Sequence, residues 1–340
     1  MGLPERAQVT SELLHVLHER YGLRSDGDPV DLGGSNNLNL HLPGPDGGWV
    51  ARVYCPWTSP ARLRAIQQVR SALVSAGLPF ATTIAARDGE SFITFEGRTV
   101  EVERYVAGER MTIGDRLLAG MGVLGRIHDV LAGIEVPSAA RSAPFPNHVE
   151  ADRALDWTRA GTANIRADDP AADDLRVADL ADELAAARAE AELPFHDHVP
   201  RQLVHGDFWD NNVWFQGDDI VLIPDLDFMG ERARIDDLAL TLYYTNSTLG
   251  PGYGDPDRIA LLCELVENYD RALTCKLSVL ERAALPYALA RTVLAFVGMV
   301  TSIDDAAPRR ALVREIALDL QWSMDLVRAV DRWQTGFAPR

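Results

Sequence analysis

Four oxygen-bearing side chains lie at characteristic intervals in residues 205–227: Asp207, then Asn212, and, beyond an apolar run, Asp225 and Asp227. Phosphoryl transfer needs these residue types in this order. One carboxylate accepts the proton of an attacking hydroxyl, and an amide oxygen and a second carboxylate hold the magnesium that bridges nucleotide phosphates. A polar turn followed by a strand and a hairpin would use some of the same residues. The Asp-to-Asn spacing, the strand and the terminal Asp together favour phosphoryl transfer.

This segment resembles the family of aminoglycoside phosphotransferases and choline kinases, and within it the antibiotic or homoserine-kinase-like subgroup. The residues that carry the resemblance are His205-Gly206-Asp207, Asn212, Pro224-Asp225-Leu226-Asp227-Phe228 and Asp237-Leu238-Ala239. The resemblance covers most of the chain from about Leu32 onward. It implies an α+β fold of the bilobal protein-kinase-like type. The small antiparallel sheet of the N-lobe would occupy residues 1–104, and the large, mostly helical C-lobe residues 105–340.

The resemblance assigns roles within the motif. Asp207 is the predicted catalytic base, and Asn212 and Asp225 are the predicted magnesium ligands. Asp227 is an alternative ligand, but Asp225 is preferred because it comes first after the apolar strand. His205 is expected to order the loop through hydrogen bonds rather than to take part in the reaction.

A candidate phosphate loop precedes these residues, with Gly34, Ser35 and Asn36 as the nucleotide contacts. Glycine lets a backbone approach phosphates closely, and successive N–H groups can point at them. An ordinary hairpin turn uses the same residue types, so the loop gains weight only from the resemblance. The pattern departs from the Walker type, which excludes a P-loop ATPase.

The predicted phosphate-binding strand contains Arg52 where the family has a lysine. The chain has a single lysine, Lys276, among 33 basic residues, so Arg52 is the basic candidate on this strand. An arginine fork can bind phosphate oxygens bidentately. The family's usual glutamate partner is absent, because residues 61–76 contain no acid; Gln67 or Gln68 stands near its place.

The remaining site predictions are less specific. By resemblance, the backbone near Glu103 and Tyr105 forms the hinge that meets the base of ATP or GTP. Asp210, Asp227 and Tyr244 are the candidate contacts to the acceptor substrate.

Periodicity predicts the elements that position these residues. Alternating apolar residues indicate strands, helical spacing indicates helices, and the order of strands first and helices later favours two lobes over a wound α/β sheet. The expected strands are 38–42, 49–54, 84–86, 91–95 and 99–105. The expected helices are 10–21, 60–76, 121–130, 150–193, 236–244, 256–276, 278–303 and 308–332.

Composition limits the class of partner. The formal net charge is −17 and no basic patch is present, which argues against nucleic acid and suits a cationic small molecule. Three cysteines without a C-x-x-C pair indicate a reducing, cytoplasmic setting. Residues 288–300 are apolar but interrupted by Arg291 and were expected to be too short to span a membrane. We therefore expect a cytoplasmic monomer or homodimer.

These observations favour a kinase that uses Mg²⁺ and ATP or GTP to phosphorylate a hydroxyl of an amine-bearing small molecule. Two alternatives remain. A non-catalytic nucleotide-binding protein of the same fold would explain the missing lysine and helix glutamate. A metal-dependent hydrolase could be built on His205 and the three aspartates, and would need a further histidine such as His196 or His198.

Overall fold

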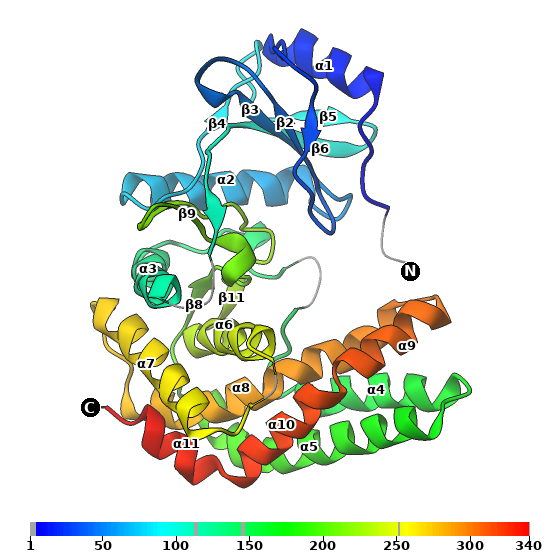
Figure 1. The fold of residues 1–340 in the computed structure, drawn as a ribbon, viewed down its shortest axis with the longest axis vertical. Helices are drawn as coiled ribbons and strands as arrows, with labels where there is room; N and C mark the ends of the chain where they lie inside the picture. The colour runs from blue at the N-terminus through cyan, green and yellow to red at the C-terminus, as the bar shows by residue number, and fades with distance from the viewer. Residues whose placement is uncertain (1–4, 112–114, 144–146, 251, 340) are drawn as a thin grey trace.

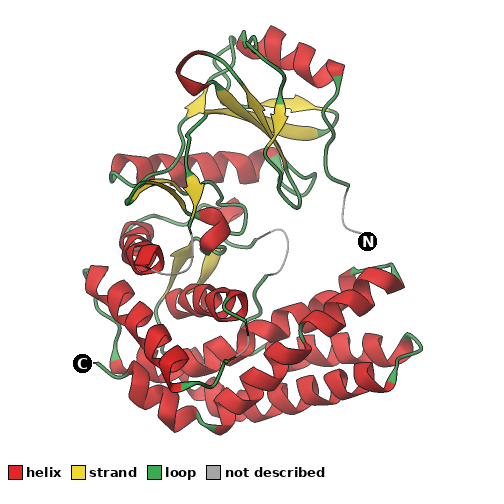
Figure 2. Cartoon of the chain, viewed as in Figure 1, coloured by secondary structure: helices red, strands yellow, loops and turns green. Residues whose placement is uncertain are grey.

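An antiparallel sheet forms one end of the molecule and a helical lobe forms the other (Figures 1 and 2). The computed structural model describes residues 5–111, 115–143, 147–250 and 252–339. The sheet consists of β1 (Val30–Asp31), β2 (Leu38–Leu42), β3 (Trp49–Val53), β4 (Thr83–Ile84), β5 (Ile93–Phe95) and β6 (Arg98–Arg104). Its order is β1-β2-β3-β6-β4, with β5 also paired to β6. The predicted α+β, bilobal architecture is confirmed.

Helix α1 (Ser11–Tyr21) covers one face of this sheet. The Thr10 hydroxyl caps the helix by accepting the N–H of Leu13 at 3.1 Å. Leu13 and Leu17 are fully buried in one cluster with the alternating leucines of β2. The apolar face of a helix, repeated every three to four residues, thus packs on the apolar face of a strand, repeated every second residue. These contacts form a separate N-lobe core.

Helix α2 (Pro60–Ser75) lies between the sheet and the helical lobe (Figure 1). Ser59 caps its first turn, and Gly77 follows its end with φ +76°, a conformation that glycine adopts without strain. The apolar face of α2, which includes Leu63, Ile66 and Val69, belongs to the large core of the C-lobe rather than to the core under α1. The helix predicted as part of the N-lobe therefore packs mainly with the C-lobe.

The C-lobe is mostly helical. Its helices are α3 (Asp115–Ala132), α4 (Ala154–Ala167), α5 (Ala172–His196), α6 (Arg234–Thr248), α7 (Pro256–Ala272), α8 (Val279–Met299), α9 (Ala306–Glu315), α10 (Ala317–Arg328) and α11 (Val330–Phe337). Two small sheets carry the site: β10 (Asp219–Leu222), β9 (Trp214–Gln216) and β7 (Glu109–Arg110) form one, and β11 (Gly230–Ala233) with β8 (Arg201–Val204) forms the other. The single helix expected over 150–193 is in fact two, because the chain breaks around Pro170. The helix expected over 308–332 is likewise interrupted at Ile316 and Ala329.

Helix α8 is the central helix of this lobe. By length and composition alone, Val279–Ser302 could cross a membrane, whereas its apolar part, residues 288–300, was expected to be too short; 83% of the apolar window is buried inside the protein. Its Arg291 is buried and pairs with Glu192 at 2.9 Å and with Asp236 at 2.6 Å. A paired arginine in a covered helix is typical of a protein core.

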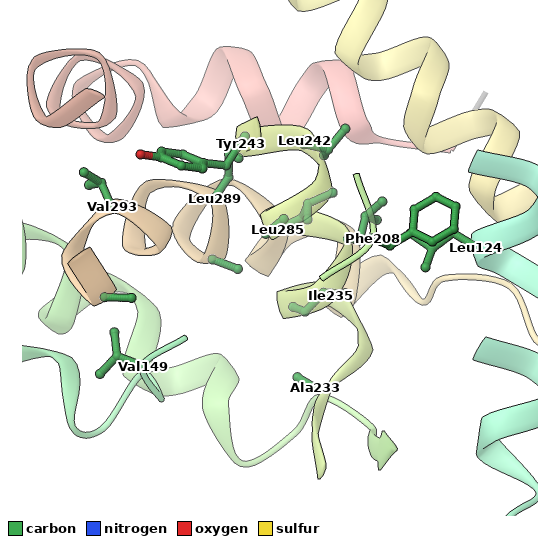
Figure 3. Close-up of a cluster of buried hydrophobic side chains, with 14 of the residues drawn as sticks. Leu124, Val149, Phe208, Ala233, Ile235, Leu242, Tyr243, Leu285, Leu289 and Val293 are labelled. Atoms are coloured by element: carbon green, nitrogen blue, oxygen red, sulfur yellow. The ribbon is translucent and has the colours of Figure 1, made fainter. Parts of the chain in front are cut away.

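Apolar side chains from α3, α6 and α8 form the core directly under the catalytic motif (Figure 3). Phe208, the residue after Asp207, is 1% exposed and inserts into this core beside Leu124. The neighbouring Asp207 is therefore attached to a rigid layer rather than to a free loop.

Candidate active site

A cleft of about 400 Å³ lies where the sheet, the segment after β6 and the catalytic motif meet. Most of the predicted site residues line it: Gly34, Ser35, Asn36, Arg52, Glu103, Tyr105, Asp207, Asn212, Asp225 and Asp227. Residues far apart in the sequence thus converge on one cleft, as the phosphoryl-transfer hypothesis requires.

Gly206 shapes the turn that presents Asp207. Its φ is +86°, and a Cβ there would lie 2.0 Å from the carbonyl oxygen of Phe228, so only glycine fits. The neighbouring His205 is fully buried, and burial lowers its pKa to about 4. Its neutral ring accepts the N–H of Asp207 on Nδ1 at 3.3 Å. This geometry supports the predicted ordering role of His205.

The Asp207 carboxylate is fixed by Asn212. The amide Nδ2 of Asn212 donates to the Asp207 carbonyl at 2.8 Å and to Asp207 Oδ2 at 2.9 Å. The Asn212 oxygen Oδ1 is left without a donor among the residues that the structure describes. Burial, followed by the charge of Asp225, raises the pKa of Asp207 to about 8, while the bond from Asn212 opposes the shift. Closely spaced carboxylates with raised pKa values are typical of cation and catalytic sites.

A buried network supports this loop from below, and the sequence analysis did not assign it. Asp237 accepts the Gly206 N–H at 2.9 Å and lies 2.9 Å from Nε2 of His128, whose Nδ1 lies 2.6 Å from the Tyr269 hydroxyl. Burial alone would raise the pKa of Asp237, but the bond with His128 keeps it below its ordinary value. Only the Asp237-Leu238-Ala239 motif signalled this network in the sequence.

Asp225 and Asp227 lie in the segment after β10, and their environments differ. Asp225 has a side-chain exposure of 27%, and its Oδ1 accepts the N–H of Asp227 at 2.8 Å. Asp227 is 8% exposed, and its Oδ2 accepts a hydrogen bond from Asn37 of the opposite lobe. Its Oδ1 is buried without a partner among the described residues, and burial followed by the charge of Asp225 raises its pKa. Asp227 therefore lines the cleft and links the two lobes through Asn37, and its contact with the substrate stays a prediction.

Arg52 on β3 faces these carboxylates. It is 5% exposed; Nη2 donates to the Pro224 carbonyl at 2.9 Å, and Nη1 lies 3.7 Å from Asp225 Oδ2. Burial alone would lower its pKa, but nearby acidic groups, Asp225 among them, raise it. Because β3 lies between β2 and β6 and Arg52 is buried, this arginine is not a surface residue of an edge strand.

The turn before β2 lines the same cleft as Arg52. Gly33 and Gly34 have φ values of +87° and +122°, and a Cβ on Gly34 would lie 2.9 Å from the Asn37 carbonyl oxygen. Asn39 holds the turn by donating to the Gly33 carbonyl at 2.9 Å. Ser35 and Asn36 follow at the cleft, so the turn has the backbone form that a phosphate loop needs.

Comparisons with known proteins agree with this geometry. The family model described as the phosphotransferase enzyme family matches residues 29–273. The chain belongs to this family. Among solved structures, it is similar to an amicoumacin kinase (14% identity, TM-score 0.66, covering 94% of this chain and 93% of that one). A microcompartment-associated aminopropanol kinase matches with 16% identity, TM-score 0.66 and coverage of 97% and 99%. An aminoglycoside phosphotransferase from Alicyclobacillus acidocaldarius matches with 13% identity, TM-score 0.65 and coverage of 97% and 98%.

Membership of the phosphotransferase family confirms the suspected resemblance and makes the departures of the N-lobe more informative. Neither glutamine of α2 replaces the absent glutamate, since Gln67 bonds to Glu101 at 2.9 Å and Gln68 is exposed. Instead the charges are reversed: Arg70 of α2 donates to Glu101 at 2.7 Å and to Glu103 at 2.5 Å on β6. The Glu103 carboxylate is thus bound by Arg70, so only the backbone of Glu103 could make the predicted contact with a nucleotide base.

The hinge also differs in detail from the prediction. The N–H of Tyr105 already donates to the Gly48 carbonyl at 3.1 Å, and its ring stacks on His41 at 4.0 Å. Within the described residues, the next hinge N–H, that of Val106, has no acceptor. Trp214 of β9, which the sequence analysis did not select, also lines the cleft, and the Arg110 guanidinium lies over its ring, 5.8 Å from the centroid.

Two predicted substrate contacts lie away from the cleft lining. Asp210 is not among the described residues that line it. Tyr244 is also outside that lining but stacks on Trp209, which is part of it, at 4.8 Å. Trp209 is the cleft residue that Tyr244 supports, and composition gave no signal for it.

The hydrolase alternative gains no support from the histidines. His205 is fully buried, and neither His196 nor His198 is among the described residues that line the cleft. One group of described residues outside the cleft has metal-ligand geometry: His148, Glu150 and Asp236. Its carboxylates are already paired with Arg201 at 2.8 Å and Arg291 at 2.6 Å, which gives it a structural explanation.

Proposed function

We propose that this member of the phosphotransferase family is a small-molecule kinase that transfers the γ-phosphoryl group of ATP or GTP to a hydroxyl of an amine-bearing acceptor. The observation that carries the proposal is the fixed pair of Asp207 and Asn212, at 2.9 Å, in a cleft shared with Asp225 and Arg52. Phosphoryl transfer depends mainly on positioning and electrostatic stabilisation, and this pair provides the positioning.

Asp207 is the proposed catalytic base. In its ionised form it accepts the proton of the acceptor hydroxyl as that oxygen bonds to phosphorus and the nucleoside diphosphate leaves. Burial and the charge of Asp225 raise the pKa of Asp207, and a magnesium ion bound at Asp225 would offset that charge and favour the ionised form that accepts the proton. Asn212 donates one hydrogen bond to the carboxylate and one to the backbone carbonyl of Asp207, which would hold the base in place for the acceptor.

Asn212 and Asp225 are the proposed magnesium ligands, with Asp227 as a nearby third acid. Magnesium prefers hard oxygen donors, and the candidates are Asn212 Oδ1, the partly exposed Asp225 carboxylate and Asp227 Oδ1. Among the described residues, neither Asn212 Oδ1 nor Asp227 Oδ1 has a hydrogen-bond donor. Bound magnesium would neutralise phosphate charge in the transition state. The amicoumacin kinase structure contains AMP-PNP and Ca²⁺, which supports a nucleotide and a divalent cation here.

The nucleotide would lie along the N-lobe side of the cleft. The turn at Gly34, Ser35 and Asn36 and the cation of Arg52 suit the phosphates, whereas Val106 and Trp214 suit the base. Either ATP or GTP would fit this proposal, because backbone groups of the hinge could bond to adenine or to guanine.

The acceptor is proposed to be a cationic antibiotic or amino alcohol. The formal charge of −17 and the similarity to amicoumacin, aminopropanol and aminoglycoside kinases support this class. Trp209, backed by Tyr244, offers an aromatic face to an ammonium group near Asp207. We propose a cytoplasmic enzyme, monomeric or homodimeric, whose partners are small molecules and not nucleic acid or membrane.

An acceptor screen tests the proposal. Purified protein is incubated with Mg²⁺, ATP or GTP, and a panel of aminoglycosides, amino alcohols and other amine-bearing hydroxyl compounds, and nucleoside diphosphate release is measured. We expect acceptor-dependent release that Asp207→Asn removes. Tight nucleotide binding without acceptor-dependent release across the panel would favour the non-catalytic alternative.

A further inference from the structure

Arg62 on α2 makes contacts that the proposed mechanism does not explain. It is 4% exposed and donates four hydrogen bonds, all to backbone carbonyls of the C-lobe side. The acceptors are Asp227 (2.8 Å), Met229 (2.6 Å), Ala139 (3.1 Å) and Ser142 (3.3 Å). Burial lowers its pKa to about 10, so the guanidinium remains a cation at neutral pH.

Two of these carbonyls belong to the segment that carries the proposed magnesium ligand. Asp227 and Met229 flank Phe228, whose own carbonyl accepts a bond from the buried Arg232 at 2.8 Å. The N–H of Asp227 in turn donates to Asp225. The segment lacks regular secondary structure from Ile223 to Phe228, so these bonds take the place of a strand or helix in fixing its backbone.

The other end of α2 holds the N-lobe. Arg70, eight positions after Arg62, pairs with Glu101 and Glu103 on β6, the strand that leads into the hinge. Since the apolar face of α2 is part of the C-lobe core, the helix connects the magnesium segment to the nucleotide-binding sheet through two buried arginines.

We propose that Arg62 is a positioning residue for the magnesium–nucleotide site, holding the Asp225–Asp227 segment in the conformation that binds the metal. This inference rests on the proposed function of that site. In this arrangement Arg70 binds the N-lobe strand β6, and Arg62 binds the backbone carbonyls of the magnesium segment. Because the acceptors are backbone carbonyls, which every residue has, the sequence does not reveal the partners of Arg62.

Arg62→Gln is the principal variant, since it keeps a polar side chain but removes the fork and the charge. Arg62→Lys restores a cation that reaches fewer carbonyls at once. Arg64→Gln is the matched control, because Arg64 lies on the same helix, is exposed, and contacts only the ring of Phe92 in the described structure. Nucleotide affinity is measured by calorimetry with Mg²⁺ and with EDTA, together with kcat and the thermal midpoint.

Loss of a residue that orients metal ligands typically weakens metal binding about 10–100-fold. We expect Arg62→Gln to lose affinity for the magnesium nucleotide by about that factor while its affinity in EDTA is unchanged. Arg62→Lys should regain part of the loss, and Arg64→Gln should match wild type. If Arg62→Gln does not fold, Arg62→Lys is held to the same criterion, a loss confined to the magnesium condition.

Two results would overturn the role of Arg62 and leave the proposed function intact, provided that the wild type binds nucleotide in a magnesium-dependent way. Arg62→Gln could lose nucleotide affinity equally in Mg²⁺ and in EDTA, or it could lose none. A wild type whose nucleotide affinity ignores Mg²⁺ would instead contradict the proposed function, and the role of Arg62 with it. The two failures are therefore distinguishable in one experiment.

Discussion

The two faces of the cleft are built in different ways. On the C-lobe face, Asp207, Asn212 and Asp225 come from one stretch of sequence and follow the family motif. On the N-lobe face, the expected lysine and glutamate are replaced by arginines: Arg52 faces the carboxylates, and Arg70 of α2 binds β6. Both faces line the same cleft, so one cleft combines a family motif on one side with supports of different chemistry on the other.

The contrast separates what reacts from what positions. The groups that would contact the hydroxyl and the metal must have particular atoms at particular places, which limits substitution. The groups that fix a helix or a loop need only supply a buried charge whose hydrogen-bond partners are present. An arginine fork with several carbonyl or carboxylate acceptors can do this as well as a helix glutamate that pairs with a lysine. Variants on each face test the distinction.

The largest effect is expected at Asp207. Asp207→Ala and Asp207→Asn should each lower kcat on the order of 10²–10⁴-fold, because the positioned base is lost. Nucleotide affinity should stay near wild type. Asp210→Asn, three residues away and outside the cleft lining, is the control and should turn over normally. Steady-state kinetics and calorimetry decide; turnover within a few-fold of wild type in either Asp207 variant would remove this residue from the mechanism.

The next effect distinguishes the two acids of the magnesium segment. Asp225→Asn should abolish the part of nucleotide affinity that depends on Mg²⁺, because it removes a charged oxygen ligand. Asp227→Asn should reduce it much less, since Asp227 is buried and engaged by Asn37. Titration with nucleotide in Mg²⁺ and in EDTA gives the order, and the reverse order would show that the metal ligand lies two residues later.

A smaller effect is expected on the N-lobe face. Arg52→Ala should raise the nucleotide KM and lower kcat, with kcat/KM falling on the order of 10–100-fold because charge-assisted hydrogen bonds are lost. Arg52→Lys should recover only part of the lost kcat/KM, because a lysine has no fork with which to bond to the Pro224 carbonyl and face Asp225 at once. Full activity in Arg52→Ala would mean that another group neutralises the phosphates.

The smallest effect compares two helix caps. The hydroxyls of Thr10 and Ser59 accept N–H bonds at 3.1 Å and 3.2 Å at the starts of α1 and α2. Thr10→Ala and Ser59→Ala should each reduce the free energy of unfolding by about 1 kcal/mol. Only Ser59→Ala should also weaken nucleotide binding, because α2 carries Arg62 and Arg70. Chemical denaturation measures the free energy of unfolding, and calorimetry measures nucleotide affinity. Equal nucleotide affinity in the two variants would mean that α2 does not couple the nucleotide-binding sheet to the magnesium segment.

The sequence predicted the C-lobe face well because its signal is local. Asp207 and Asn212 are five residues apart, and the strand before Asp225 separates it from them by one hairpin, so spacing alone constrains their geometry. The sheet was predictable for the same reason, since alternation along β2 and β3 reports a buried face.

The N-lobe supports could not be predicted because their partners are distant or are backbone atoms. Arg70 and Glu103 are 33 positions apart, Arg62 and the Asp227 carbonyl 165, and Asn37 and Asp227 190. The absence of an acid from residues 61–76 was visible in the sequence, but the reversal of charge that replaces it was not. Asp210 and Tyr244 were selected by residue type; neither is among the described residues that line the cleft, and their contacts with the substrate stay predictions.

The product of the reaction tests the central claim most directly. Phosphorus NMR of the wild-type protein with Mg²⁺, nucleoside triphosphate and an acceptor from the screen should show a new phosphomonoester appearing in equal amount with nucleoside diphosphate. Inorganic phosphate in place of that phosphomonoester would indicate a hydrolase. An unchanged triphosphate spectrum despite tight nucleotide binding would indicate a non-catalytic binding protein, and either result would contradict phosphoryl transfer from Asp207, Asn212 and Asp225.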